Sequence, residues 1–251
     1  VSIKSNEVDV RFDKGRDWRA RIGFVLVPTD GVIEGEMFKL APQGVGVHFT
    51  RVPGSEDVTV ENLLAMEHEL EDCASRFVFG KDLNVVCFAC TSASALIGEE
   101  RVNAALSRGA PQAKHTSLIG GVLNALRTLQ ASRIVVASPY LDDVNTLEAD
   151  YIEKPGFEIM DFQGMNLLID PDIRLVAPDF IKEYATKLNH KEAEAIFISC
   201  GGLRSLEIVE ALEKEVGKPV VVSNQAMFWN ALRLAGIGDK IEGYGRLFID
   251  H

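Results

Sequence analysis

The chain has 251 residues and a formal net charge of −11 at pH 7. Such an acidic protein lacks the basic surface that nucleic acids require, so DNA and RNA are not expected partners. No apolar run approaches about 18 residues, so we expect no membrane span, and the first seven residues lack the apolar core of a signal peptide. Hydrophobic residues make up 47% of the chain, enough for a sizeable core that needs no disulfides. We expect a reduced, cytoplasmic, globular enzyme.

In the first part of the chain, short apolar runs alternate with patterns in which apolar residues recur about every 3.6 positions. Apolar runs predict strands, and the longer period predicts helices. The predicted strands cover residues 21–28, 44–52 and 84–89. The predicted helices cover residues 33–40 and 59–77, the stretch after Thr91, and a segment that starts at His115.

The second part of the chain continues this alternation. The predicted strands cover residues 134–140, 157–162, 195–199 and 219–223, and the predicted helices cover 143–153, 180–188 and 203–216. Alternating strands and helices predict an α/β fold with parallel sheets and helices on their faces.

Two segments of the first part of the chain resemble segments about 110 residues later. The apolar run that begins at Arg21 resembles the run that begins at Arg133, 112 residues later, and the strand before Cys90 resembles the strand before Cys200, 110 residues later. A repeated offset indicates a duplicated unit. We therefore expect two pseudo-symmetric domains, each a parallel sheet flanked by helices, with the active site in the cleft between them. Residues 19–118 and 224–251 are assigned to the first half, and residues 119–223 to the second.

Cys90 and Cys200 are the candidate catalytic residues. Each follows a buried strand and precedes small residues, at the carboxyl end of a parallel strand, where α/β sheets place ligands. A helix that begins there would lower the thiol pKa and attract a substrate carboxylate. Free cysteine is also often a buried hydrophobic residue, and Cys73 is expected to be one. Two cysteines at equivalent points of a repeat favour catalysis.

Other interpretations of the polar and glycine residues are weaker. Cys87 and Cys90 have the C-x-x-C spacing, but Cys87 lies inside a predicted strand, where a redox pair is not expected. No histidine spacing suggests zinc and no glycine motif suggests a nucleotide, so we expect neither metal nor cofactor. His115 is the one histidine near the predicted cleft, and a structural role suits it better. Gly120 and Gly121, within a helical pattern, predict close helix packing.

The residues around the two cysteines resemble a known family. The segments FACTSAS (88–94), IGEERV (97–102), SCGGL (199–203), SNQA (223–226) and LRLAG (232–236) are similar to the aspartate/glutamate racemase superfamily. The similarity is to the branch that contains maleate cis-trans isomerase, arylmalonate decarboxylase and the ectoine-utilisation protein EutA. It covers nearly the whole chain from about residue 21. It implies two pseudo-symmetric parallel-sheet domains and chemistry without metal or cofactor.

The resemblance also implies residue roles. In the racemases, one thiolate removes an α-proton and the opposite thiol delivers one. In maleate isomerase a thiolate adds to the double bond, and the decarboxylase keeps only the second-half cysteine, which protonates an enediolate. Cys90 and Cys200 match the two acid/base or nucleophile positions. The expected substrate-binding residues are Pro28, Thr29, Thr91, Ser92, Tyr140, Gly201 and Gly202.

Three functions remain open at this point. The presence of both cysteines favours an isomerase or racemase acting on a small carboxylate or dicarboxylate. The SCGG segment (199–202) and the enediolate donors favour an arylmalonate-type decarboxylase, and a non-catalytic carboxylate-binding protein is the third possibility. Where isomerases carry asparagines for the substrate carboxylate, this chain has Thr29 and either Asp170 or Pro171, which argues against maleate. A homodimer is the default assembly.

Overall fold

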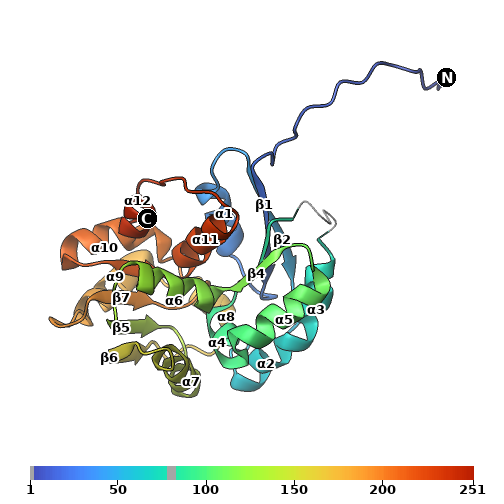
Figure 1. Ribbon diagram of the computed structural model, residues 1–251. Helices are drawn as coiled ribbons and strands as arrows, with labels where there is room; N and C mark the ends of the chain where they lie inside the picture. Colours follow the sequence, from blue (N-terminus) through green and yellow to red (C-terminus); the bar gives the residue numbers. More distant parts are fainter. Residues whose placement is uncertain (1–2, 78–82) are drawn as a thin grey trace.

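The computed structural model describes residues 3–77 and 83–251, and its strands form two four-stranded sheets. The first sheet has the order β2-β1-β3-β4 and contains β1 (Ala20–Leu26), β2 (Val45–Arg51), β3 (Val85–Phe88) and β4 (Lys114–Ser117). The second has the order β6-β5-β7-β8 and contains β5 (Arg133–Ser138), β6 (Glu158–Gly164), β7 (Ala195–Ile198) and β8 (Val220–Val222). All neighbouring strands are parallel. The matching orders confirm the predicted pseudo-symmetric pair of parallel sheets (Figure 1).

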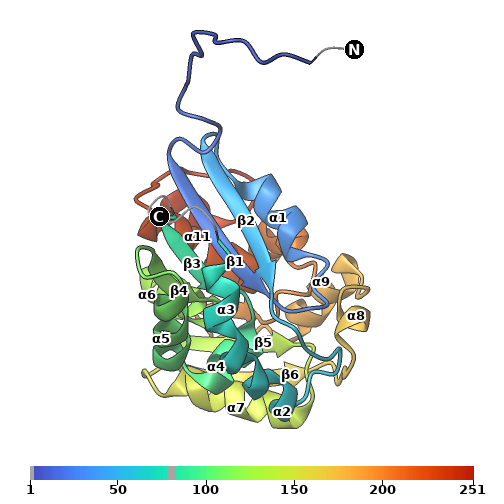
Figure 2. The ribbon, with the colours of Figure 1, turned by 90° about the vertical axis from the view of Figure 1, so that its right-hand side faces the viewer.

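Helices cover these sheets, as Figures 1 and 2 show. They are α1 (Ile33–Leu40), α2 (Val60–Ala65), α3 (Leu70–Ser75), α4 (Thr91–Ile97), α5 (Glu99–Gly109), α6 (Leu118–Thr128), α7 (Asp142–Glu153), α8 (Asp170–Ile173), α9 (Pro178–Lys187), α10 (Val209–Val216), α11 (Ser223–Leu234) and α12 (Arg246–Asp250). The short 3-10 helices η1 (Met66–Glu69) and η3 (Leu206–Ile208) complete the set. Among the described residues, no helix is both long and apolar enough to cross a membrane.

Two inner strands, β3 and β7, and the edge strand β8 are buried along their whole length. β3, β7 and β8 read VVCF, AIFI and VVV and are fully buried, as parallel strands covered by helices require. Their β-branched and aromatic side chains suit a pleated surface. The core includes the buried rings of Phe24, Phe88, Phe197 and Phe228.

Helices α6 and α11 join the two halves. They pack against each other, and each contacts both β4 and β8. A Cβ on Gly121 would lie only 3.1 Å from the carbonyl oxygen of Ala226, so the backbones approach closely there. This confirms the predicted close packing at Gly121 and fixes the relative position of the two sheets.

Several predicted boundaries are wrong. The segment from His115 is the edge strand β4, whose polar KHTS sequence lacks the apolar run of an inner strand, and α6 begins only after Ser117, which caps it. The predicted helix 59–77 is α2, η1 and α3 in succession. The predicted helix 203–216 begins as a turn and continues as η3 and α10. Ser223, predicted as the end of a strand, opens α11.

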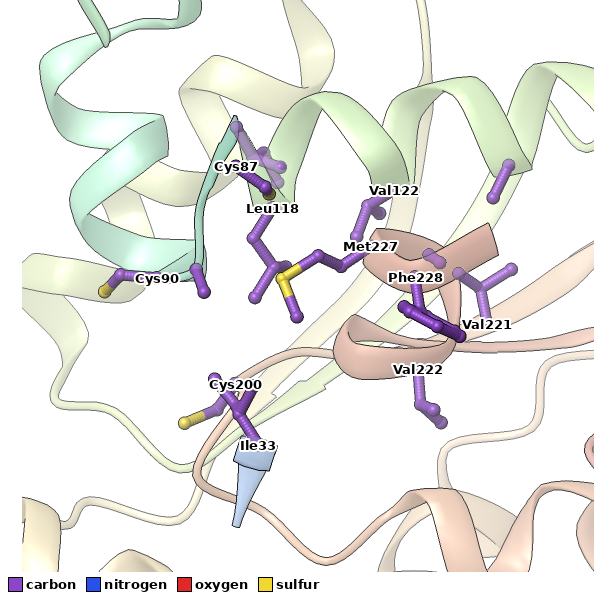
Figure 3. Close-up of a cluster of buried hydrophobic side chains, with 14 of the residues drawn as sticks. Ile33, Cys87, Cys90, Leu118, Val122, Cys200, Val221, Val222, Met227 and Phe228 are labelled. Carbon is purple, nitrogen blue, oxygen red and sulfur yellow. The ribbon is translucent and has the colours of Figure 1, made fainter. Parts of the chain in front are cut away.

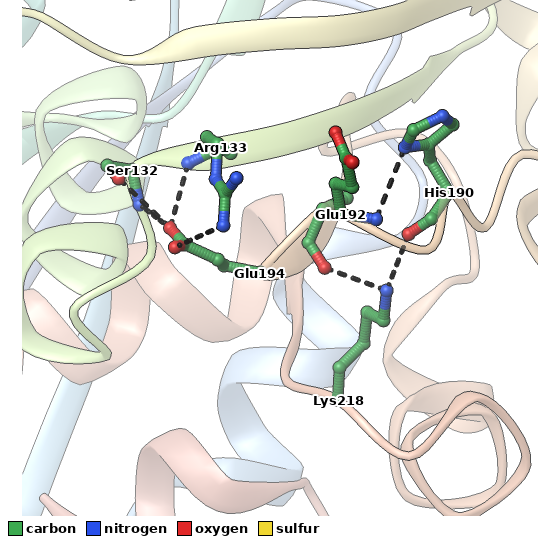
Figure 4. A network of polar contacts seen from close by, with 7 residues as sticks. Ser132, Arg133, His190, Glu192, Glu194 and Lys218 are labelled. Atoms are coloured by element: carbon green, nitrogen blue, oxygen red, sulfur yellow. Dashed lines mark hydrogen bonds and ion pairs between the residues drawn. The ribbon is translucent and has the colours of Figure 1, made fainter.

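Polar contacts at the amino ends of the second sheet stabilise the strand starts (Figure 4). The Glu194 carboxylate accepts the backbone N–H groups of Ser132 at 2.8 Å and Arg133 at 3.0 Å, and these bonds lower the pKa of Glu194 to about 2. Lys218 donates to the carbonyl oxygens of His190 and Ala193. These hydrogen bonds therefore hold the amino ends of the strands in place, and the carboxyl ends of the strands border a cavity.

Candidate active site

The carboxyl ends of strands from both sheets border one cavity. Its lining residues are Val27, Thr29, Asp30, Ile33, Ser55, Asp57, Val58, Leu63, Met66, Ala89, Cys90, Thr91, Ser92, Tyr140, Asp170, Cys200, Gly201 and Gly202. Cys90 follows β3 and Cys200 follows the equivalent strand β7. Figure 3 shows both side chains pointing to the same side, away from the packed core around Leu118 and Met227. The fold thus brings the two candidate thiols to the lining of one cavity.

Cys90 stands at the beginning of a helix, as expected. Its extended backbone, with φ −137° and ψ 121°, precedes the first turn of α4. The Cys90 sulfur lies 3.7 Å from the Ser92 hydroxyl, and the backbone N–H of Ala93 also points toward it. Ser94 binds back to the Cys90 carbonyl oxygen and fixes the turn. The thiol is therefore held by local donors that favour its ionised form.

Cys200 has a different backbone. Its φ is +101°, a region that non-glycine residues avoid and that is found mainly where a site imposes strain. No helix begins directly after it, because η3 starts only at Leu206, so the helix predicted from Leu203 begins later than expected. The sulfur instead accepts the N–H of Gly202 at 3.3 Å, and the Tyr140 hydroxyl lies within hydrogen-bonding reach. A strained turn thus takes the place of the expected helix.

Burial dominates the acidity of both thiols. It raises the pKa of Cys90 to about 12 in spite of the donors around it, and it raises that of Cys200 well above its ordinary value. The negative charge of Asp170 raises both further. Burial therefore raises the pKa of both thiols, where the sequence predicted that a helix start would lower it.

One serine links the two cysteine turns. The Ser223 hydroxyl, at the start of α11, accepts the Cys200 N–H at 3.0 Å and lies 2.9 Å from the Thr91 hydroxyl. Ser223 was not predicted as a site residue. Its signal was its place in the repeat, because Ser223 lies between β8 and the body of α11 as Ser117, the last residue of β4, lies directly before α6.

A second unpredicted pair supports the turn after Cys200. The Asn224 side-chain amide donates to the Gly201 carbonyl oxygen at 2.9 Å and to the Glu36 carboxyl at 2.6 Å. Burial raises the pKa of Glu36 to about 8. A largely neutral Glu36 on α1 thus anchors the Cys200 turn through Asn224.

The expected substrate-binding residues lie around this cavity with one exception. Thr29, Thr91, Ser92, Tyr140, Gly201 and Gly202 line it. Pro28 does not, and its ring lies 3.6 Å from where a Cβ on Gly54 would stand. The ring of His115, on β4, forms a hydrogen bond with the carbonyl oxygen of Ala110 at the end of α5, and His115 has the structural role expected of it.

The other cysteines and the acidic residues complete the description. Cys73 and Cys87 are buried and line no part of the cavity, and all four cysteines are free. The Thr29 hydroxyl donates to Asp170, which with Pro171 is one of the two residues expected where the isomerases carry an asparagine. Within residues 3–77 and 83–251, no three His, Cys, Asp or Glu side chains gather as metal ligands.

Comparison with known proteins fits this architecture. Residues 22–248 match the family model described as arylmalonate decarboxylase. The chain is 29% identical over 242 residues to arylmalonate decarboxylase of Bordetella bronchiseptica, covering 90% of this chain and 95% of that protein. It is 28% identical over 239 residues to maleate isomerase of Nocardia farcinica, covering 90% and 94%.

Solved structures agree with these relatives. A mutant of arylmalonate decarboxylase in its liganded form superposes with a TM-score of 0.85 at 27% identity, covering 92% of this chain and all of that one. A cysteine-to-serine mutant of Nocardia farcinica maleate cis-trans isomerase, with a covalently bound succinylcysteine intermediate, gives a TM-score of 0.85 at 26% identity, covering 92% and 99%. The resemblance inferred from the sequence is confirmed, and the chain belongs to the arylmalonate decarboxylase family.

Proposed function

We propose that the protein is a cofactor-independent isomerase or racemase that uses Cys90 and Cys200 on opposite faces of a small carboxylate substrate. The observation that carries the proposal is that both thiols line one cavity from equivalent strands of the two sheets. A racemase needs a base on one face of the reacting carbon and an acid on the other. A decarboxylase needs only one proton donor, so the second thiol would have no role there.

The proposed proton transfer balances between the two sulfurs. A thiolate at one cysteine takes the proton on the carbon next to the carboxylate, and the C–H electrons move into the carboxylate to form an enediolate. The opposite thiol then gives its proton to the other face and becomes the thiolate. In the isomerase variant the thiolate instead adds to a C=C bond, the C–C bond rotates and the thiolate leaves. The covalent succinylcysteine in the Nocardia farcinica enzyme, as described for that protein, supports the second variant.

Hydroxyl donors in the cavity suit the charge that develops in either step. Thr91, Ser92 and Tyr140 line it and are buried, where hydrogen bonds to an oxyanion act in a low dielectric. Each such donor is worth roughly 3 kcal/mol to the transition state. We assign the substrate carboxylate to Thr91 and Ser92, next to Cys90.

The test combines single-cysteine variants with two readouts. Cys90→Ala and Cys200→Ala are each assayed for turnover of a panel of small carboxylates and for exchange of the α-hydrogen with deuterated solvent. Loss of turnover in both variants is expected, because each half of the reaction needs its own thiol. Cys73→Ala, at a buried thiol outside the cavity, is the matched control. Unchanged turnover and exchange in both active-site variants would refute the proposal.

An arylmalonate-type decarboxylase is the second candidate. The family model and the retained donors Thr91, Ser92 and Tyr140 favour it. In that reaction carbon dioxide leaves, an enediolate forms, and Cys200 protonates it. The discriminating result is release of carbon dioxide from phenylmalonate that survives Cys90→Gly and is lost in Cys200→Ala.

A further inference from the structure

The cavity that holds the cysteines is lined by acidic residues and lacks basic ones. The carboxyl groups of Asp30, Asp57 and Asp170 border it, and none of the described lining residues is Lys, Arg or His. A small dicarboxylate would bring two further negative charges into this space. Like charges held together away from bulk water repel each other. The lining therefore discriminates between substrates by their charge.

Asp30 is already engaged by the fold. One oxygen accepts the backbone N–H groups of Ile33 at 3.2 Å and Val32 at 3.4 Å, at the start of α1. The other oxygen lies 3.9 Å from the Arg51 guanidinium. The charge of Asp30 is thus partly compensated by protein groups.

Asp170 borders the reacting thiol. It opens α8, and the Thr29 hydroxyl, from the loop after β1, donates to one of its oxygens. Its other oxygen lies 3.6 Å from the point where a Cβ on Gly202 would stand, and the Cys200 sulfur lies 3.5 Å from the same point. A ligand group beside Gly202 would therefore meet both the carboxylate and the thiol.

Arg174, a cation that interacts with Asp170, is not part of the cavity lining. Arg174 attracts Asp170 electrostatically, but its guanidinium lies against Gly31, with one nitrogen 2.8 Å from where a Cβ would stand. The carboxylate of Asp170 thus faces the cavity with Thr29 as its only direct hydrogen-bond donor among the side chains described.

Asp170 also affects thiol acidity. Its negative charge raises the pKa of both Cys200 and Cys90. A cationic substrate group beside Asp170 would offset this effect and favour a thiolate, whereas a second carboxylate would strengthen it. Asp170 would therefore favour a substrate with a cationic group in two ways, by binding that group and by letting a cysteine thiol ionise more easily when the group is bound.

We infer that the cavity takes a monocarboxylate whose second polar group is a cationic hydrogen-bond donor, as in an amino carboxylate with an ammonium group, and that Asp170 binds that group. The inference rests on the proposed function for the position of the carboxylate at Thr91 and Ser92. It assigns Asp170 as a specificity-determining residue.

The test uses three ligands that share one skeleton. β-Alanine, butyrate and succinate each carry a carboxylate on two methylene groups and end in an ammonium, a methyl and a second carboxylate. Their affinities for the full chain are measured by calorimetry at neutral pH. We expect β-alanine to bind most tightly and succinate least. In Asp170→Asn, β-alanine should lose at least about tenfold in affinity and succinate should gain.

The controls separate this inference from its alternatives. Asp172→Asn removes an exposed carboxylate two residues away on α8 and should leave all three affinities unchanged. Succinate binding more tightly than β-alanine in the unmodified chain would overturn the inference. So would succinate binding that depends on Arg174, shown by its loss in Arg174→Ala. These ligands need not react, so the predicted order of affinities can hold even if the cysteine variants refute the proposed reaction. Conversely, a different order of affinities would overturn the role of Asp170 without refuting the proposed reaction.

Discussion

The hydroxyl of Thr91 on α4 lies 2.9 Å from the hydroxyl of Ser223 on α11, so one hydrogen bond joins the cysteine turns of the two sheets. Ser223 also accepts the Cys200 N–H. Either hydroxyl can donate in the bond between Thr91 and Ser223, and the arrangement that suits the proposed reaction is the one in which Ser223 donates to Thr91. The Thr91 proton is then free to point into the cavity, where the proposed enediolate would form.

Ser223→Ala should therefore reduce both activity and stability. The buried Cys200 N–H loses its acceptor, which costs about 1–3 kcal/mol of the free energy of unfolding, and Thr91 loses the partner that orients it. We expect kcat to fall about tenfold to a hundredfold, with a smaller change in KM. Steady-state kinetics and urea unfolding measure the two effects.

Ser117→Ala is the matched control, since Ser117 ends β4 and directly precedes α6, the equivalent place in the first sheet. It caps α6 by accepting the Gly120 N–H at 3.1 Å and contacts neither cysteine. We expect a loss of about 1 kcal/mol in stability with nearly unchanged kcat. Equal losses of kcat in the two variants would show that Ser223 acts through folding alone.

Gly201→Ala and Gly202→Ala should differ although they are neighbours. A Cβ on Gly201 would lie 2.8 Å from the Ile33 side chain and 3.0 Å from the Asn224 amide oxygen, so either these buried side chains or the turn must shift. We expect a loss of about 1–3 kcal/mol in stability. A Cβ on Gly202 meets its nearest neighbour at 3.5 Å, an ordinary contact, and should mainly raise KM by narrowing the cavity. Thermal unfolding and kinetics of the pair test this, and an equally destabilised Gly202→Ala would contradict it.

Glu36 should make stability depend on pH. Burial raises its pKa from 4.5 to about 8, so the folded protein holds a proton that the unfolded chain releases. The stability contributed by this protonated group is complete below about pH 4.5 and is lost as the pH rises toward 8. The loss is on the order of 4 kcal/mol.

Glu36→Gln removes this titration while keeping an acceptor for Asn224. Between pH 5 and pH 9 the unmodified protein should lose several kcal/mol more in free energy of unfolding than the variant, on the order given by linkage. Urea unfolding at both pH values measures the difference. Parallel pH curves for the two proteins would show that Glu36 does not titrate in this range.

Glu148 should control the reactivity of Cys90 at alkaline pH. Burial on α7 raises the pKa of Glu148 to about 7, and its negative charge raises the pKa of Cys90. Glu148→Gln should therefore speed alkylation of Cys90 by iodoacetamide roughly threefold to tenfold at pH 8.5, with little effect at pH 6. Asp150→Asn, at an exposed position of the same helix, is the control. Mass spectrometry of the labelled peptide gives the rates, and an equal acceleration at both pH values would point to altered access instead.

The sheets could be predicted because inner parallel strands have a strong local signal. The runs around Val85 and Ala195 are continuous and apolar, and their spacing repeats along the chain. The edge strand β4 gave no such signal, because its polar residues face solvent at one end. Helix starts also depended on geometry that no local pattern carries, as the left-handed backbone at Cys200 shows.

The site was predictable to a similar extent. Residues next to strand ends, such as Thr91 and Tyr140, were placed at the cavity by their position relative to the strands. Ser223 and Asn224 act through partners 132 and 188 residues away in sequence, Thr91 and Glu36, and only the folded chain shows these contacts. Burial raises the pKa of the Cys90 thiol, whereas the hydrogen-bond donors at the start of α4 lower it. Burial has the larger effect, and the sequence alone does not show which of the two is larger.

The location of the two cysteines on separate sheets has a stereochemical consequence. Under the proposed function each thiol serves one face of a planar enediolate, so the hand of the product depends on which thiol delivers the proton. A variant that keeps only one of the two would protonate a prochiral intermediate from a single side. The two-sheet architecture can therefore give either enantiomer of the product, and the substitution of one cysteine would determine which enantiomer forms.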